Sequence, residues 1–149
     1  MSAAKTVAMG NDHVAFELKF LLKPLLEEMG YTVINFGCDD AAAVDYPDYA
    51  SAVAQAIESG QAEWGVLICG SGLGISIAAN RHPGIRATPV HDTLGARLAR
   101  EHNNANVLCL GAQMIGPWVA RDCLETFFTT AFQPDIHGAR VKMLGCLPA

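Results

Sequence analysis

Short apolar runs alternate along the chain with longer segments in which apolar residues recur every three or four positions. Each run has four to six residues, the length expected of strands that are buried on both faces of a sheet. The predicted strands are residues 6–9, 32–36, 64–69, 86–90 and 107–110. The segments between and after them predict helices over residues 14–29, 48–59, 73–80, 93–101 and 117–128.

This alternation predicts the α/β class, with a five-stranded parallel sheet and helices on both of its faces. No repeat, low-complexity tract or linker divides the sequence. Residues 1–149 are therefore expected to form a single domain, with a C-terminal tail after about residue 130. In such sheets ligands bind beyond the carboxyl ends of the strands, so functional residues are expected directly after the apolar runs.

Composition and charge narrow the class of protein. The chain is 51% apolar, and no stretch approaches the length of a membrane span or has the features of a signal peptide, which predicts a cytoplasmic protein. Fifteen acidic residues against ten basic ones give a net charge of −5, without any cluster of Lys and Arg. Nucleic acid and membrane surfaces are therefore not expected as partners.

The five cysteines are odd in number and irregularly spaced, and no Cys/His set has the spacing of zinc ligands. Neither a disulfide framework nor a metal site is expected. Each cysteine is either a small core residue or a reactive thiol, and its context decides which.

The strongest chemical signal is the sequence Cys-Gly-Ser-Gly-Leu-Gly at residues 69–74, where a strand ends and a helix begins. Backbone N–H groups of a glycine-rich turn, together with the positive end of the helix dipole, form a cradle for an anion. The same field would favour the thiolate of Cys69. The alternative is that Cys69 is only a buried strand residue beside a tight turn.

Other uses of this loop are tested by spacing. A phosphate-binding loop of an NTPase requires a lysine that is absent, and a cysteine phosphatase requires arginine where Ile75 stands. Ile75 also replaces the third glycine of a dinucleotide-binding fingerprint, although Asp92 could act as the ribose-binding acid. A nucleotide- or dinucleotide-binding module therefore stays open as an alternative from another class.

Three further groups could carry chemistry. Asp12 and His13 follow the first strand, where Asp12 could cap the next helix through the N–H of Ala15, face a substrate hydroxyl, or do both.

His102 could shuttle a proton, but it precedes its strand and so lies at the opposite edge of the sheet from Cys69, which suggests a contribution from a partner subunit. His137, Arg140 and Lys142 form a basic group near the C-terminus, either in a solvated tail or in an arm that reaches an anion.

Taken together, four ordered motifs resemble the type B ribose-5-phosphate isomerase family, which includes the galactose-6-phosphate isomerase subunits. They are Gly-Asn-Asp-His at 10–13, Asp-Tyr-Pro-Asp-Tyr-Ala at 45–50, the 69–74 loop with Ala-Asn-Arg at 79–81, and His-Asn-Asn-Ala-Asn at 102–106 with Leu-Gly at 110–111. The resemblance implies a Rossmann-like three-layer sandwich, no cofactor or metal, and a homodimer or dimer of dimers with shared active sites.

The resemblance also implies a role for each site residue. Cys69 would move a proton between C1 and C2 of an open-chain sugar, and Ser71 with the backbone of Gly70, Gly72 and Gly74 would stabilise the enediolate. His102 and Asp12 would open the sugar ring, Asn103 would hold the developing oxygen charge, and Tyr46 would line the pocket. His13 and Arg140 would meet the phosphate.

Two positions depart from the family pattern. Gln113 and Ile136 stand where the family commonly has arginine. Loss of two cations weakens the expected grip on a phosphate dianion. Ribose 5-phosphate remains the expected substrate, and a tetrose phosphate, a hexose phosphate or a free aldose are alternatives.

Overall fold

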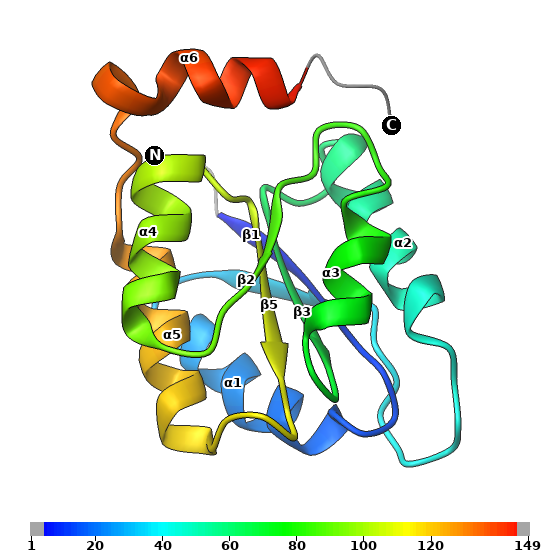
Figure 1. Ribbon diagram of the computed structural model, residues 1–149. Helices are drawn as coiled ribbons and strands as arrows, with labels where there is room; N and C mark the ends of the chain where they lie inside the picture. Colours follow the sequence, from blue (N-terminus) through cyan, green and yellow to red (C-terminus); the bar gives the residue numbers. More distant parts are fainter. Residues whose placement is uncertain (1–4, 146–149) are drawn as a thin grey trace.

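Five parallel strands form the central sheet of the protein. The computed structural model describes residues 5–145, and its strands are paired in the order β2-β1-β3-β5-β4 (Figure 1). Their bounds are β1 (Thr6–Asn11), β2 (Thr32–Asn35), β3 (Trp64–Cys69), β4 (Ala87–Pro89) and β5 (Val107–Gly111). The predicted α/β class and five-stranded parallel sheet are confirmed.

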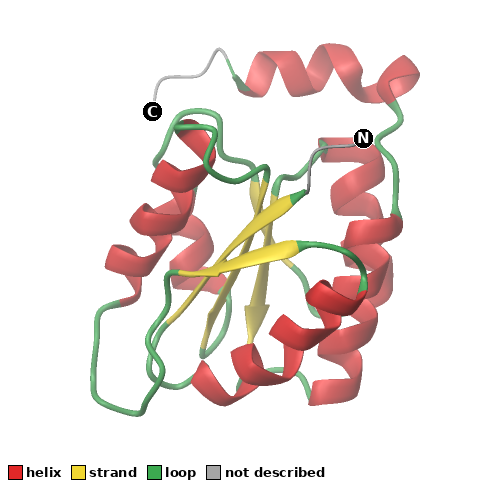
Figure 2. Cartoon of the chain, turned by 180° about the vertical axis from the view of Figure 1, so that it is seen from behind, coloured by secondary structure: helices red, strands yellow, loops and turns green. Residues whose placement is uncertain are grey.

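Helices cover both faces of this sheet, which gives the expected three-layer sandwich (Figure 2). The covering helices are α1 (Phe16–Glu28), α2 (Tyr46–Glu58), α3 (Leu73–Ala79), α4 (Thr93–Asn103) and α5 (Pro117–Thr129), and a sixth helix, α6 (Pro134–Leu144), lies across one end of the molecule (Figure 1). Helices α2 and α5 carry a proline in the first turn, where the missing N–H has no helical partner to lose. Helix α4 is capped by Asp92, whose side chain accepts the N–H of Gly95 at 2.6 Å.

The apolar core lies in two parts, one on each face of the sheet. Leu22 and Leu26 of α1 pack with Phe127 of α5 on one face, and Val53 of α2 packs with Ile75 of α3 on the other. The central strands contribute to both parts because alternate side chains point to opposite faces. This packing fixes the sheet, and therefore fixes the positions of the loops at its carboxyl edge.

The C-terminal region differs from the prediction. Residues 134–144 form helix α6, whereas the sequence predicted a tail after about residue 130 that follows the last helix. Helix α6 has no buried residue. A helix is predicted from apolar residues that recur along its buried face, and α6 has no such face. Its imidazole at His137 stacks on that of His102 in α4, with ring centroids 4.1 Å apart and an interplanar angle of 26°.

The two edges of the sheet have different surroundings. The arrowhead of β5 points to the end of the molecule opposite α6, so α6 lies at the amino edge and the loop after Cys69 lies at the carboxyl edge (Figure 1). Within residues 5–145, no helix is long and apolar enough to cross a membrane.

Candidate active site

Cys69 is the last residue of β3, and the backbone of the following turn is folded around its sulfur. The N–H of Gly72 donates to the Cys69 Sγ at 3.2 Å. Gly72 adopts a left-handed conformation with φ of 77°, and a Cβ there would lie 3.0 Å from the carbonyl carbon of Leu110. Only glycine satisfies both conditions. The Cys69 sulfur is therefore held by a backbone N–H at the wall of the turn.

The glycine-rich turn is held against the loop that follows β5. The N–H of Ala112 donates to the carbonyl of Cys69 at 2.8 Å, and the N–H of Gln113 donates to the carbonyl of Gly70 at 2.9 Å. Because these bonds join two loops at the carboxyl edge, the turn is preorganised before any ligand arrives.

A cavity of about 650 Å³ opens over this turn. Six of the predicted site residues line it together: Asp12, Tyr46, Cys69, Gly70, Ser71 and Gly74. The ring of Tyr46 lies so close to Gly74 that a Cβ on that glycine would be 2.6 Å from the Tyr46 Cζ. Tyr46 therefore forms one wall of the cavity directly against the turn.

Three other residues complete the lining: Val14, Gln113 and Met114. The sequence drew attention to Gln113 only as a missing arginine. Val14 and Met114 were not predicted, because an apolar side chain at a loop carries no chemical signal in a single sequence.

Asp12 is 7% exposed and sits at the start of the β1–α1 connection. Burial raises the pKa of its carboxyl above the ordinary value, against the lowering effects of the Val14 N–H and of His13. Its Oδ1 accepts the N–H of Val14 at 3.1 Å. The predicted helix cap is therefore wrong in detail: α1 is capped at Ala15 without a side-chain bond, and Asp12 instead closes a local turn.

His13 lies beside this turn, and its Nδ1 accepts the backbone N–H of Val44 at 3.2 Å. This bond leaves Nε2 as the ring nitrogen that is available to a ligand. His13 is not among the residues that line the cavity. The bond ties it to the β2–α2 connection.

The remaining predicted residues lie elsewhere in the same chain. His102 and Asn103 end α4, and Arg140 is exposed on α6, so none of them lines the cavity that holds Cys69. Desolvation, followed by the charges of His102 and Arg140, lowers the pKa of His137, which stacks on His102. Ile136 is 68% exposed on α6.

The other described cysteines differ from Cys69 in their surroundings. Burial raises the pKa of Cys109 strongly, and raises that of Cys123 to about 11. Burial also raises the pKa of Cys38. All four cysteines in the described part of the chain are unpaired, and Cys146 lies outside it. Across residues 5–145, no three His, Cys, Asp or Glu side chains are grouped so that they could hold a metal ion.

Comparisons with known proteins show the family of the chain. A family model described as Ribose/Galactose Isomerase matches residues 7–144. The chain is 40% identical to ribose-5-phosphate isomerase B of Escherichia coli, over 94% of each chain. It is 37% identical to D-erythrulose-4-phosphate isomerase of Pectobacterium atrosepticum, over 94% of this chain and 93% of that one.

A solved structure of ribose-5-phosphate isomerase B from Clostridium thermocellum superposes with a TM-score of 0.92 at 44% identity, covering 94% of this chain and 95% of the other. Fold and sequence thus define a sugar phosphate isomerase. The chain belongs to the ribose/galactose isomerase family, as its motifs indicated.

Proposed function

We propose that this protein is a cofactor-free aldose–ketose isomerase that interconverts D-ribose 5-phosphate and D-ribulose 5-phosphate. The observation that carries the proposal is the Cys69 sulfur, which accepts the Gly72 N–H at 3.2 Å on the wall of the cavity. A thiolate beside preorganised N–H donors suits abstraction of a proton next to a carbonyl.

In this reaction Cys69 takes the proton from C2 of the open-chain aldose, and the electrons move onto O1 to give an enediolate. The N–H groups of the turn that are not already bound to the Cys69 sulfur or the Ser71 hydroxyl stabilise the charge on oxygen together with that hydroxyl. The proton on O2 passes to O1, and the proton held by Cys69 returns to C1. The reaction therefore needs no external oxidant or reductant.

Two subunits would share each site. His102, Asn103 and Arg140 lie away from the Cys69 cavity of their own chain, so a second copy would have to present them to it. In that arrangement His102 and Asp12 open the sugar ring, Asn103 holds the developing charge, and Arg140 with His13 binds the phosphate. A homodimer or a dimer of dimers would satisfy this geometry. We place the protein in the cytoplasm.

The phosphate end of the substrate is where this chain differs from the family pattern. Gln113 gives the cavity a neutral amide, and the residues that line the cavity include the acid Asp12 but no Lys or Arg. This supports weak binding of ribose 5-phosphate and good competition from other sugars. The similarity to D-erythrulose-4-phosphate isomerase supports a tetrose phosphate in particular as the alternative substrate.

A panel assay over phosphorylated and free sugars of four to six carbons tests the substrate. We expect turnover of ribose 5-phosphate with a high KM, and a comparable or higher kcat/KM for a shorter sugar phosphate. Saturation at low micromolar ribose 5-phosphate, without turnover of any other sugar, would show that Arg140 and His13 suffice.

In the nucleotide-binding alternative, the candidate ribose-binding acid Asp92 has one carboxylate oxygen engaged as the cap of α4. Thermal unfolding with NAD or ATP tests it directly, because a ligand that binds only the folded protein raises the melting temperature. No shift is expected with either, and a clear shift would favour that class.

A further inference from the structure

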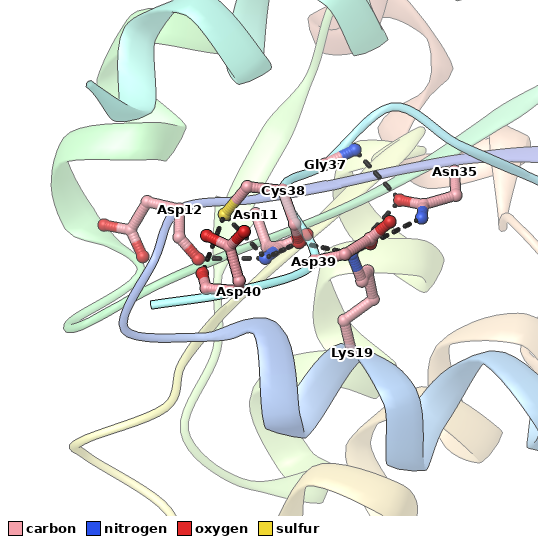
Figure 3. Close-up of polar contacts among 8 residues, drawn as sticks. All are labelled: Asn11, Asp12, Lys19, Asn35, Gly37, Cys38, Asp39 and Asp40. Atoms are coloured by element: carbon pink, nitrogen blue, oxygen red, sulfur yellow. Dashed lines mark hydrogen bonds and ion pairs between the residues drawn. The ribbon is translucent and has the colours of Figure 1, made fainter. Parts of the chain in front are cut away.

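Lys19 is a fully buried lysine on the sheet-facing side of α1. It is 0% exposed, and it lies beside Leu18 and one turn before Leu22 on the buried stripe of the helix. Its ammonium donates to Asn35 Oδ1 at 3.2 Å, to the carbonyl of Cys38 at 2.5 Å, and to Asp39 Oδ1 (Figure 3). An ammonium has three N–H donors, and all three are used.

All three acceptors belong to residues 35–39, which begin at the last residue of β2. The same segment is bound internally, since Asn35 Nδ2 donates to Asp39 Oδ1 at 2.8 Å and the Gly37 N–H donates to Asn35 Oδ1 at 3.0 Å. The hydrogen bonds from Lys19 and Asn35 hold the pKa of Asp39 below its ordinary value. The ammonium is therefore the centre around which this segment is folded.

A second buried side chain links this cluster to the active site. Asn11 is 0% exposed, and its Nδ2 donates to the carbonyl of Cys38 at 3.0 Å and to that of Asp12 at 2.9 Å. In Figure 3, Asn11 lies between Lys19 and Asp12, and the Asp12 carboxylate points away from Lys19. The Lys19 cluster and the Asp12 turn thus share one amide.

The segment also leads directly into the cavity wall. Residues 36–45 form no helix or strand and are followed by Tyr46, the first residue of α2. Val44 in this connection donates to His13, and Tyr46 packs against Gly74. The position of both predicted substrate-binding side chains, His13 and Tyr46, therefore depends on how the connection is anchored at its start.

A buried charge is an inefficient way to stabilise a core, because well-packed apolar side chains of similar volume do as well or better. The three hydrogen bonds from Lys19 instead hold the backbone of residues 35–39 in one defined conformation. We propose that Lys19 is a positioning residue, which anchors residues 35–39 so that Tyr46 is held at the wall of the substrate cavity and His13 is held beside the Asp12 turn. The inference rests on the proposed function for its kinetic consequences only.

The test compares Lys19→Met and Asp39→Asn with Lys23→Met as the matched control. Lys23 lies one turn further along α1 and pairs with Glu27 at the surface, away from the cavity. Lys19→Met should remain folded, since the Asp39 side chain is 60% exposed and is not left buried without a partner. It should lower kcat/KM about tenfold, mainly through KM, because the binding groups lose their alignment. Asp39→Asn should act in the same direction, and Lys23→Met should match the wild type.

Amide hydrogen exchange gives the second readout. In Lys19→Met the Val44 amide should exchange faster than in the wild type, with the amides of β3 unchanged. Kinetic constants and Val44 exchange both within about twofold of the wild type would overturn the proposal. If Lys19→Met does not fold, Asp39→Asn decides by the same two measurements. A wild type without isomerase activity would contradict the proposed function, and the exchange experiment would still test the anchor.

Discussion

The environment of a cysteine decides whether it is a core residue or a base. Cys69 and Cys109 are both buried and lie on neighbouring strands of the sheet. Cys109 is enclosed within β5, and burial raises its pKa strongly. Cys69 ends its strand, borders the cavity and receives an N–H from Gly72. The assignment of chemistry to Cys69 depends on this position and not on the residue type.

Asp12 is predicted to lower the stability of the folded protein at neutral pH. Burial raises the pKa of Asp12 in the folded protein, so folding favours the protonated form and the ionised carboxylate opposes folding at neutral pH. Asp12→Asn should therefore melt at a higher temperature than the wild type at neutral pH. The difference should shrink as the pH falls and Asp12 becomes protonated in both states. Thermal unfolding across pH measures it, and a lower melting temperature at neutral pH would contradict it.

Gly74 is predicted to be required by Tyr46 rather than by the backbone. A Cβ at Gly74 would lie 2.6 Å from the Tyr46 Cζ, and the half-exposed ring can move away. Alanine is also the better helix former, so Gly74→Ala should remain folded. We expect KM to rise by roughly tenfold because Tyr46 is displaced from the cavity wall. Gly116→Ala, where nothing lies within 4 Å of the new Cβ, is the control and should not change KM.

Helix α6 is the element whose role is least visible within one chain. It has no buried residue, yet it carries Arg140. If Arg140 meets the phosphate, Arg140→Ala loses a charge-assisted hydrogen bond worth about 1.5–3 kcal/mol, which raises KM roughly 10- to 150-fold. Lys142→Ala, an exposed cation on the same helix, should leave KM unchanged. Steady-state kinetics separates the two, and equal effects would contradict a specific contact.

Elements with a strong apolar pattern were predicted nearly to the residue, and weakly patterned ones were not. The strand ending at Cys69 was predicted exactly where β3 lies, because it is buried on both faces. Helix α6 was missed since it buries nothing. Lys19 was also missed, although a lysine on the buried stripe of α1 was a usable signal. Its acceptors lie at residues 35–39, and such long-range contacts cannot be deduced from one sequence.

At the level of the whole molecule, the candidate residues are divided between two edges of the sheet. Cys69 is at the carboxyl edge and His102 is at the end of α4, beside α6 (Figure 1). Six predicted residues share one cavity, while His102, Asn103 and Arg140 do not line it. Active sites shared between two copies of the chain would bring these two sets of residues together.

Mixed subunits test this division. Cys69→Ala and His102→Ala should each be inactive, but a hybrid dimer of the two has one site with both residues intact. After free exchange of subunits, about a quarter of the wild-type activity should return, since half of the dimers are hybrids with one working site each. Hybrid dimers that are detected by native mass spectrometry and remain inactive would contradict shared sites.

Proton transfer by Cys69 is tested most directly by isomerisation in D₂O, with the product analysed by NMR. The wild type should convert ribose 5-phosphate with deuterium appearing at C1 of the ribulose 5-phosphate formed, because a proton held on sulfur can exchange with solvent. Cys69→Ala should fold normally and show neither conversion nor incorporation, a loss of about 10²-fold or more in rate. Conversion that retains all of the substrate hydrogen and is unaffected by Cys69→Ala would contradict the mechanism.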